Sequence, residues 1–405
     1  MNKFIKIFKD NSFFLILSLF LLILLIVSFY DLQPGIDQIR QISWAKSLND
    51  SQYFLDFNLV SSKGLIYYDK NSFFQNLFKT TYFDIGHLFN LVPILLLYFL
   101  NIIFNNEVLI FNITSIFFSV LNLIISYLIC KKLFYKDIKA PKYYIFDLVL
   151  FFNLIPAYLI LYSPLGIHNI SVFFLLLTFF ININNKDKIN IFYIVLISSL
   201  GIFSHKINAI LIPSFVAISF ICEKKFNLLF KYCLYIIIIF SPLVFLIFIF
   251  PEMLASTKQF SNGENNLNHL IRLSLWFQNI INTLGYITLF FFLYGFIQFT
   301  KKEKLNYFNI LIIMHILLYV VINSFSHYYL RTNLYITHTI LILSFYGFIK
   351  LLIIQKYYFK IIVIFLFLLN VSFNIFQLFN NNLINNKLIQ NMKYIIKMTN
   401  LYLLA

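Results

Sequence analysis

Charged residues are scarce in this chain, because only 11% of its 405 positions carry a charge whereas 61% are hydrophobic. Apolar runs of eighteen or more residues recur along its whole length, and a water-soluble core cannot absorb that many. One such run is long enough to cross the roughly 30 Å hydrocarbon layer of a membrane. The sequence therefore predicts that the body of the protein is embedded in lipid.

Alternating polarity is missing as well, and this excludes a spanning β-barrel. Barrel strands need about ten residues of alternating polarity, whereas the runs here are continuous, as in "FFLILSLFLLILLIVSFY" before Asp31. The predicted fold class is therefore all-α: a polytopic transmembrane protein with about eleven spanning helices.

Cysteines and the signatures of soluble enzymes are also few or absent. The three cysteines, Cys130, Cys222 and Cys233, fall at predicted cytoplasmic helix ends, so no disulfide framework is implied. The chain has no Walker loop, no dinucleotide-binding glycine pattern, no His-Glu-x-x-His and no paired cysteine ligands. These absences argue against an ATP-driven or redox mechanism.

The net charge of +16 is explained by where the basic residues stand. Nineteen of the 31 Lys and Arg fall in six short segments that can all lie on the cytoplasmic side of the membrane, as the positive-inside rule requires. We therefore expect no nucleic-acid partner. The segments are Lys3 to Lys9, Lys131 to Lys142, Lys186 to Lys188, Lys224 to Lys231, Lys301 to Lys304, and Lys350 to Lys360.

The charge pattern predicts a topology in the inner (plasma) membrane with a cytoplasmic N-terminus. The first apolar run lacks a cleavage site, so we expect it to be retained as the first spanning helix. Residues 1–379 form a single integral membrane domain, and 380–405 form an Asn- and Lys-rich tail. The expected outer loops are 31–107, 163–168, 205–206, 251–278 and 326–335. The expected spans are 12–29, 108–130, 143–162, 169–184, 190–204, 207–222, 232–250, 279–299, 307–325, 336–354 and 361–379.

The first outer loop contains two further predicted helices. Ile36, Ile39 and Ile42 recur every three residues after Pro34 and Gly35, which predicts an amphipathic helix on the membrane surface. The apolar stretch from His87 to Phe104 is expected to lie in or dip into the outer leaflet, with a bend at Pro93. An ordinary crossing that locally violates the charge rule is the alternative.

Ionisable residues at the outer membrane boundary are the candidates for function, because charge is costly to keep there. Asp37 lies in the first turn of the amphipathic helix and is suited to accept a proton from an attacking hydroxyl, or else simply caps that helix. His205 and Lys206 interrupt the apolar segment "GIFSHKINAILIP". They are suited to bind a lipid phosphate or pyrophosphate, or else form a polar hairpin turn.

Three more residues complete the candidate set. Arg331 lies among tyrosines in "SHYYLRTNLYITH", where it could bind phosphate while tyrosines stack on a sugar; an interfacial aromatic belt is the alternative. His168, in "YSPLGIHN", could act as a base or ligate a metal, or else be an interfacial polar residue. His87, close to Asp84, begins the outer-leaflet segment and is either a substrate contact or a polar helix cap.

Taken in order, these parts resemble the GT-C superfamily of membrane glycosyltransferases, which includes protein mannosyltransferases and uses polyprenyl-phosphate-linked sugars. The resemblance covers roughly residues 12–354: a first span, a long outer loop opening with Asp37 and an amphipathic helix, an interfacial stretch, and a helix ending in "LICKKLF". "GIFSHKINAILIPSF" also resembles a segment of the EpsG-type exopolysaccharide polymerases, with Ile207 at a serine position. The residues leave the choice between the two subgroups open.

The resemblance implies a polyprenyl-phosphate-linked sugar donor and a glycan, lipid or protein acceptor outside the cytoplasm, with Asp37 as the base and the remaining candidates as substrate contacts. Two features depart from the pattern: the second outer loop carries His168 and Asn169 instead of an acid, and Gln38 follows Asp37 instead of a second acid. We therefore expect no metal and no other cofactor. A flippase or other transporter of lipid-linked oligosaccharides is the alternative from a different class.

Overall fold

The computed structural model describes residues 91–104, 107–134, 168–184, 190–205, 207–249, 269–302, 334–354 and 356–380, together with Ile313 and Leu317. Within these residues every regular element is a helix and no strand occurs, in agreement with the predicted fold class. The helices are α5 (Leu91–Phe104), α6 (Glu107–Phe134), α9 (His168–Asn184), α10 (Ile191–Ile202), α11 (Asn208–Cys222), α12 (Phe226–Ile249), α14 (His269–Lys302), α16 (Leu334–Ile354) and α17 (Tyr357–Asn380).

The helices from α6 onward each overlap a predicted apolar span. The start of α14 was predicted wrongly, since α14 begins at His269, ten residues before the expected start at 279 and inside the expected outer loop 251–278. The bounds of α9, α11 and α16 differ from the predicted ones by two residues or fewer. Helix α12 begins at Phe226, earlier than the expected Tyr232, because the exposed Lys231 lowers hydropathy without interrupting the backbone hydrogen bonds. The expected spans 12–29 and 143–162, most of 307–325, the surface helix after Gly35 and the tail lie outside the described residues.

Four helical stretches in the described residues are long and apolar enough to cross a membrane: Ile113–Phe134, Ile280–Lys301, Tyr335–Ile353 and Tyr357–Asn374. Helices α5, α9, α10, α11 and α12 contribute shorter apolar stretches. These findings describe a membrane-type helical protein.

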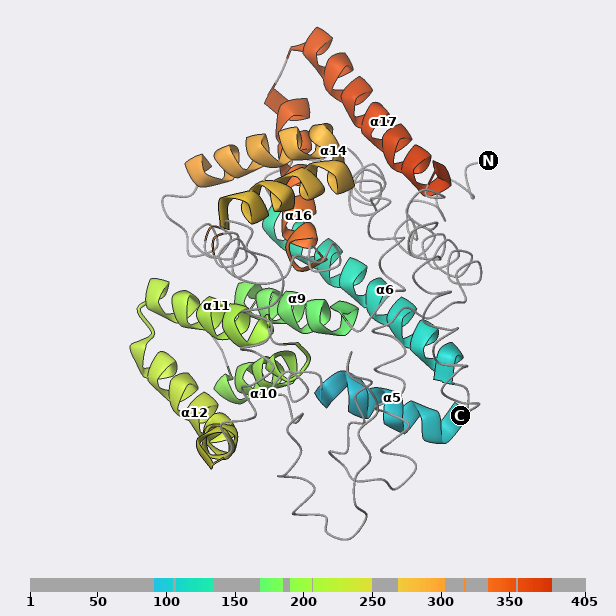
Figure 1. The fold of residues 1–405 in the computed structure, drawn as a ribbon. Coiled ribbons are helices and arrows are strands. Elements are labelled where there is room, and N and C mark those ends of the chain that lie inside the picture. Colours follow the sequence, from blue (N-terminus) through green and yellow to red (C-terminus); the bar gives the residue numbers. More distant parts are fainter. Residues whose placement is uncertain are drawn as a thin grey trace, which may run out of the picture.

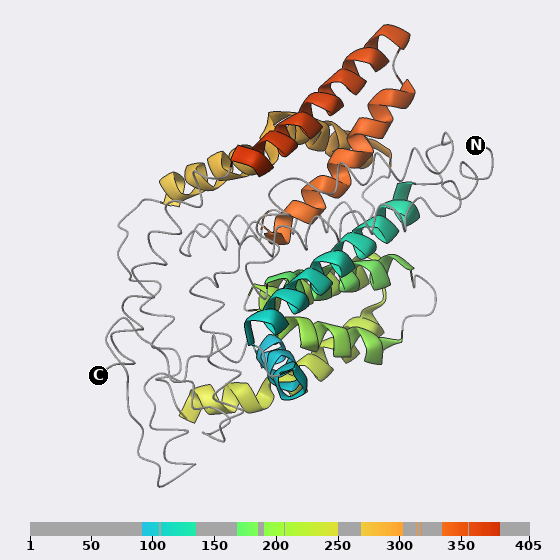
Figure 2. The ribbon, with the colours of Figure 1, turned by 90° about the vertical axis from the view of Figure 1, so that its right-hand side faces the viewer.

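The helices form two groups with α6 between them (Figures 1 and 2). Helices α14, α16 and α17 make up one group, whereas α9 to α12 make up the other; α6 packs against both α16 and α9. Helix α17 lies at the edge and buries one stripe, Val363, Phe367, Asn370 and Asn374, while it leaves large apolar side chains such as Phe365 exposed. This one-sided packing is what a helix bordering lipid requires.

Two pairs of helices run parallel in a fixed register. In α9 and α11, Ser171 contacts Asn208 and Asn182 contacts Ser219, and both pairs are 37 residues apart in sequence. In α6 and α16, Ser126 contacts His338 at a separation of 212 residues. Eight residues further along both helices, the rings of Phe134 and Tyr346 stack with their centroids 4.5 Å apart. Each pair of contacts fixes both the direction and the axial position of its two helices.

Glycines shape α14 at two positions. Gly295 lies against Gly347 of α16 so closely that a Cβ on either residue would meet the backbone of the other helix. Gly285 breaks the helical geometry of α14 with φ 78° and ψ 155°, a conformation that favours glycine. Beside the break, Thr288 donates a hydrogen bond of 3.1 Å to Oδ1 of Asn370 in α17.

Helix α5 is short and is tied to the end of α10. Its 14 residues extend about 21 Å, which is less than the thickness of the hydrocarbon core. Pro93 lies in the first turn of α5, where proline is compatible with a helix. The expected bend at Pro93 stays a prediction, because the residues before Leu91 lie outside the described residues. The backbone N–H of Val92 donates to the carbonyl of Phe203 at 3.0 Å, and this places the start of α5 beside the loop that follows α10.

Candidate functional site: a histidine pair at the helix ends

Two of the six predicted site residues are described, and they lie in contact with each other. His168 is the first residue of α9, and His205 lies in the short connection between α10 and α11. Their rings meet edge to face with the centroids 4.9 Å apart. The other four predicted residues, Asp37, His87, Lys206 and Arg331, lie outside the described residues.

Tyr335 of α16 completes the cluster. Its ring lies 5.3 Å from that of His205 and 6.0 Å from that of His168, between centroids. Its hydroxyl lies 3.4 Å from Nδ1 of His168, which is within hydrogen-bonding distance. All three side chains are buried, with at most 9% of any residue exposed. Three elements far apart in the sequence therefore bring two imidazoles and a phenol together.

The tautomer of neutral His205 follows from the turn in which it lies. The backbone N–H of Ile207 points at Nδ1 of His205 with a distance of 3.3 Å, so Nδ1 accepts a hydrogen bond. A neutral imidazole with an accepting Nδ1 carries its proton on Nε2. Neutral His205 can therefore donate a hydrogen bond from Nε2, and it can take up a second proton only by giving up the contact with Ile207.

Asn208 fixes the turn that carries His205. Its fully buried amide nitrogen lies 2.9 Å from the carbonyl of Ser171 in α9 and 3.1 Å from the carbonyl of Gly201 in α10. Ser204 adds a short hydrogen bond to the same Gly201 carbonyl. Gly201 is needed here, because a Cβ would meet Ile212 of α11 and Phe174 of α9. Asn208, three residues after His205, therefore holds α9, α10 and α11 together next to the histidine pair.

A second layer of polar contacts connects this cluster to α6. Asn122 donates to the carbonyl of Asn169, the residue after His168, at 3.0 Å. One turn further along α6, Ser126 lies 3.1 Å from Nδ1 of His338 in α16. His338 is three residues after Tyr335 and is buried. The polar contacts thus continue from the site into the interior of the helix bundle.

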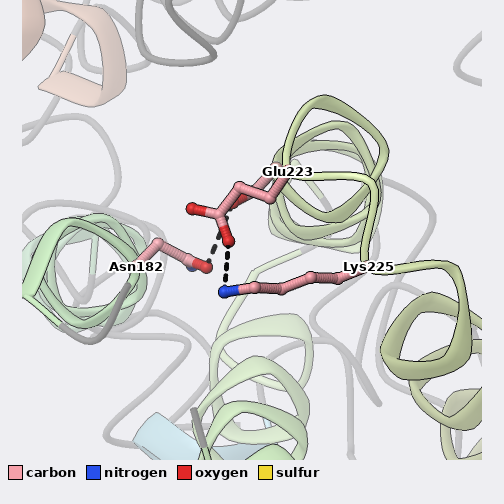
Figure 3. A network of polar contacts seen from close by, with 4 residues as sticks. Asn182, Glu223 and Lys225 are labelled. Carbon is pink, nitrogen blue, oxygen red and sulfur yellow. Dashed lines mark hydrogen bonds and ion pairs between the residues drawn. The ribbon is translucent and has the colours of Figure 1, made fainter. Parts of the chain in front are cut away.

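The far ends of α9 and α11 carry a different polar network (Figure 3). Ser219 donates to Oδ1 of Asn182 at 3.4 Å, and Lys225 pairs with Glu223 at 2.7 Å between Nζ and Oε2. Lys225 is directly preceded by the exposed Lys224. The Ser219–Asn182 hydrogen bond joins the ends of these two parallel helices, so the network has a structural role.

Sequence reasoning did not identify Tyr335, His338, Asn122 or Asn208 as site residues. One signal was present for the first two, since Tyr335 and His338 are three residues apart and so share one face of a helix. The asparagines gave no such signal, because a polar residue in an apolar run shows neither its partner nor its depth. Only the tertiary contacts assign them to the site.

The described cluster offers hydrogen-bond donors and acceptors and two groups that can hold a proton, which suits recognition of phosphate or hydroxyl groups. Within the described helices, no group of three or more His, Cys, Asp or Glu is placed to hold a metal ion. Asparagine amides and serine hydroxyls make up most of the surrounding polar groups. The chemistry that the described residues support is thus recognition and proton transfer.

No protein-family model matches the chain, and no curated protein matches it significantly.

Proposed function

We propose that the protein is a membrane glycosyltransferase that moves a sugar from a polyprenyl-phosphate-linked donor to a glycan, lipid or protein acceptor on the extracytoplasmic face. One observation supports this most directly. His168 and His205 belong to two separate polar interruptions of the apolar sequence, and their rings lie 4.9 Å apart. Residues that recognise one substrate must meet in space, and these two do.

The proposed orientation has eleven spans, a cytoplasmic N-terminus and the site on the outer side of the inner membrane. The parallel pair α9 and α11, with α10 between them, supports an alternating path through the membrane. The parallel pair α6 and α16 supports an odd number of crossings between them, and the proposed topology has seven. The lysines at the ends of α6, α14 and α16 lie at the ends away from Tyr335, as a cytoplasmic side requires.

In the proposed reaction, Asp37 accepts the proton of the acceptor hydroxyl as the acceptor oxygen bonds to the anomeric carbon of the sugar. The bond between that carbon and the phosphate oxygen breaks, and polyprenyl phosphate leaves. Lys206 and Arg331 neutralise the departing phosphate, so the reaction needs no metal ion. Lys206 follows His205 directly, and Arg331 precedes Tyr335 by four residues. Both cations are therefore close in sequence to residues of the described cluster.

The histidines and Tyr335 are assigned to donor recognition. His205 donates from Nε2, and the hydroxyl of Tyr335 and the ring of His168 add polar contacts at the same place. His87 precedes α5 by four residues, and the start of α5 is bonded to Phe203, two residues before His205. This arrangement supports a role for His87 at the same substrate.

The test uses the purified full-length protein in liposomes with radiolabelled polyprenyl-phosphate-linked hexoses and pentoses, and measures the release of polyprenyl phosphate. We expect wild-type protein to consume at least one donor and Asp37→Asn to lose at least about 100-fold in rate. His205→Ala and Tyr335→Phe should lower the rate while the protein stays inserted. Tyr232→Phe is the matched control, since it removes a phenol that is equally buried but lies on α12. A wild-type protein that consumes no donor would refute the proposal.

Two alternatives give different results in the same liposomes. A polymerase of the EpsG type would consume only a polyprenyl-pyrophosphate-linked oligosaccharide and lengthen its glycan. A transporter would move the lipid-linked sugar between leaflets without releasing polyprenyl phosphate. The break at Gly285 inside an apolar helix favours the transporter, because interrupted helices are common in transporters.

A further inference from the structure

Helix α6 carries a stripe of polar side chains that is buried along its length. Ser115, Ser119, Asn122 and Ser126 follow at intervals of four, three and four residues, so they share one face of the helix. Each is buried, and Ser126 is fully enclosed. Polar groups are costly in the interior of a membrane protein, and those that occur there are typically tied to function.

Two of these side chains reach across to other helices, and both reach residues next to the candidate site. Asn122 binds the carbonyl of Asn169 in α9, directly after His168, and Ser126 binds His338 in α16, one turn after Tyr335. Asn122 and Ser126 are four residues apart on α6, which is the spacing of neighbours on a helix face. Adjacent turns of one helix therefore hold the two sides of the His168–Tyr335 contact.

The register of α6 and α16 makes this arrangement specific. Phe134 stacks on Tyr346 eight residues beyond the Ser126–His338 contact, and Phe299 of α14 packs edge-on against the same tyrosine with centroids 5.6 Å apart. Aromatic packing thus fixes α16 at one end, and the hydrogen bond to His338 fixes it near the site. Moving α16 along its axis would break both contacts at once.

We propose that α6 is the positioning element of the site: Asn122 sets His168, and Ser126 with His338 sets Tyr335, so that their polar atoms stay within hydrogen-bonding distance. Ser126 and His338 are positioning residues, since neither touches the His168 and His205 rings in the described contacts. Their importance for sugar transfer rests on the function proposed above, whereas the positioning itself does not.

A role in helix packing alone explains this stripe less well. Apolar side chains of similar volume would fill the same space without the cost of burying an imidazole and an amide. A hydrogen bond adds directionality. The two bonds reach Asn169, directly after His168, and His338, one turn after Tyr335, so they lie on both sides of the His168–Tyr335 contact. The polar side chains Asn122 and Ser126 are therefore better explained by a role in fixing the positions of His168 and Tyr335.

The test is a histidine NMR experiment on the full-length protein in nanodiscs with ¹⁵N-labelled imidazoles, which is practical because the chain has only seven histidines. Ser126→Ala should shift the imidazole signals of His338 and also of His168, which Ser126 does not touch. Ser126→Thr keeps the hydroxyl and should restore the His168 signal. Ser199→Ala is the matched control, since its hydroxyl bonds within its own helix, to Val195.

A second pair of variants keeps the test decisive if Ser126→Ala does not fold. His338→Asn retains a polar atom near the position of Nδ1 and should leave the His168 signal in place, whereas His338→Leu should shift it. If Ser126→Ala and His338→Leu leave the His168 signal unchanged in folded protein, the positioning proposal is overturned. This readout does not involve sugar transfer, so it stands apart from the test of the proposed function.

Where transfer is detected, the kinetic effect separates positioning from binding. Ser126→Ala should lower kcat about tenfold with KM within about twofold, because misplacing a contact group slows the reaction more than it weakens ground-state binding. An equal loss with Ser199→Ala, or a loss confined to KM, would contradict the proposal.

Discussion

Lys224 shows at the residue scale how the chain ends one membrane helix and starts the next. It has a φ of 54°, in the left-handed region that glycine favours. The N–H of Lys225 bonds to the carbonyl of Phe220, and the N–H of Lys224 bonds to that of Ile221. This is the Schellman pattern of helix termination, with lysine where glycine is usual. The left-handed conformation is therefore less favourable for Lys224 than it would be for glycine.

Lys224→Gly should therefore stabilise the protein by about 0.5–1 kcal/mol, because glycine adopts the left-handed conformation without strain. The free energy of unfolding can be measured by titration with sodium dodecyl sulfate from detergent micelles. Lys224→Ala is the control, since it removes the same charge but keeps the Cβ atom. Equal stabilities for the two variants would show that the positive φ costs nothing here.

The site could be predicted from sequence only in part, and its residues show why. His168 and His205 interrupt apolar runs, so the pattern exposes them directly. Tyr335 belongs to a tyrosine-rich segment in which nothing distinguishes it, and His338 lies within an apolar helix. Asn122 and Asn208 act through partners 47 and 37 residues away. The sequence shows that a residue is polar, but it does not show which distant residue that side chain contacts.

At the scale of elements, α14 and α16 approach each other through glycine rather than through interlocking side chains. A Cβ on Gly347 would overlap the carbonyl oxygen of Phe291 and lie 2.7 Å from the backbone nitrogen of Gly295. Small residues at a crossing let two backbones come close, which is a common basis of helix association in membranes. The contact is backbone against backbone, so neither glycine leaves room for a side chain.

Gly347→Ala should therefore destabilise the protein by about 1–3 kcal/mol, because the added methyl group can be accommodated only if a helix moves. Gly201→Ala should cost less, since the closest atom there is Cδ1 of Ile212, the mobile end of a side chain. The two variants can be compared in the same detergent titration. A larger loss for Gly201→Ala would mean that α14 and α16 separate easily.

The helices were predicted more completely than the site, for a physical reason. Spanning length and apolarity are local properties, and they place α9, α11 and α16 to within two residues. The early starts of α12 and α14 and the break at Gly285 were not anticipated. A hydropathy pattern ends at an exposed lysine even where the helix continues. A single glycine in an apolar run does not indicate whether its φ is positive.

At the scale of the whole molecule, the parallel pairs and the lysine-rich ends give a testable sidedness. Asn190, Lys224 and Lys356 are exposed at the connections away from the histidine pair, whereas Lys206 follows His205 directly. In the proposed topology the first three positions face the cytoplasm and Lys206 faces outward. One labelling experiment can test all four positions.

Single cysteines at these positions, in a protein lacking Cys130, Cys222 and Cys233, should react differently with a membrane-impermeant maleimide applied to intact cells. We expect labelling at position 206 and, without permeabilisation, none at 190, 224 and 356, because the lipid barrier separates the two sides. Permeabilised cells provide the control for reactivity. Labelling of position 190 or 356 in intact cells would contradict the proposed orientation.

The sequence separations of the two parallel pairs have a consequence for biogenesis. The contacts between α9 and α11 span 37 residues and can form as soon as α11 leaves the ribosome, so the two histidines can meet early in synthesis. The contact between Ser126 and His338 spans 212 residues and must wait until α16 has been made. A nascent chain stopped before α16 would therefore hold the histidine pair without its tyrosine, inserted but unfinished. The site is therefore completed only after synthesis has passed α16.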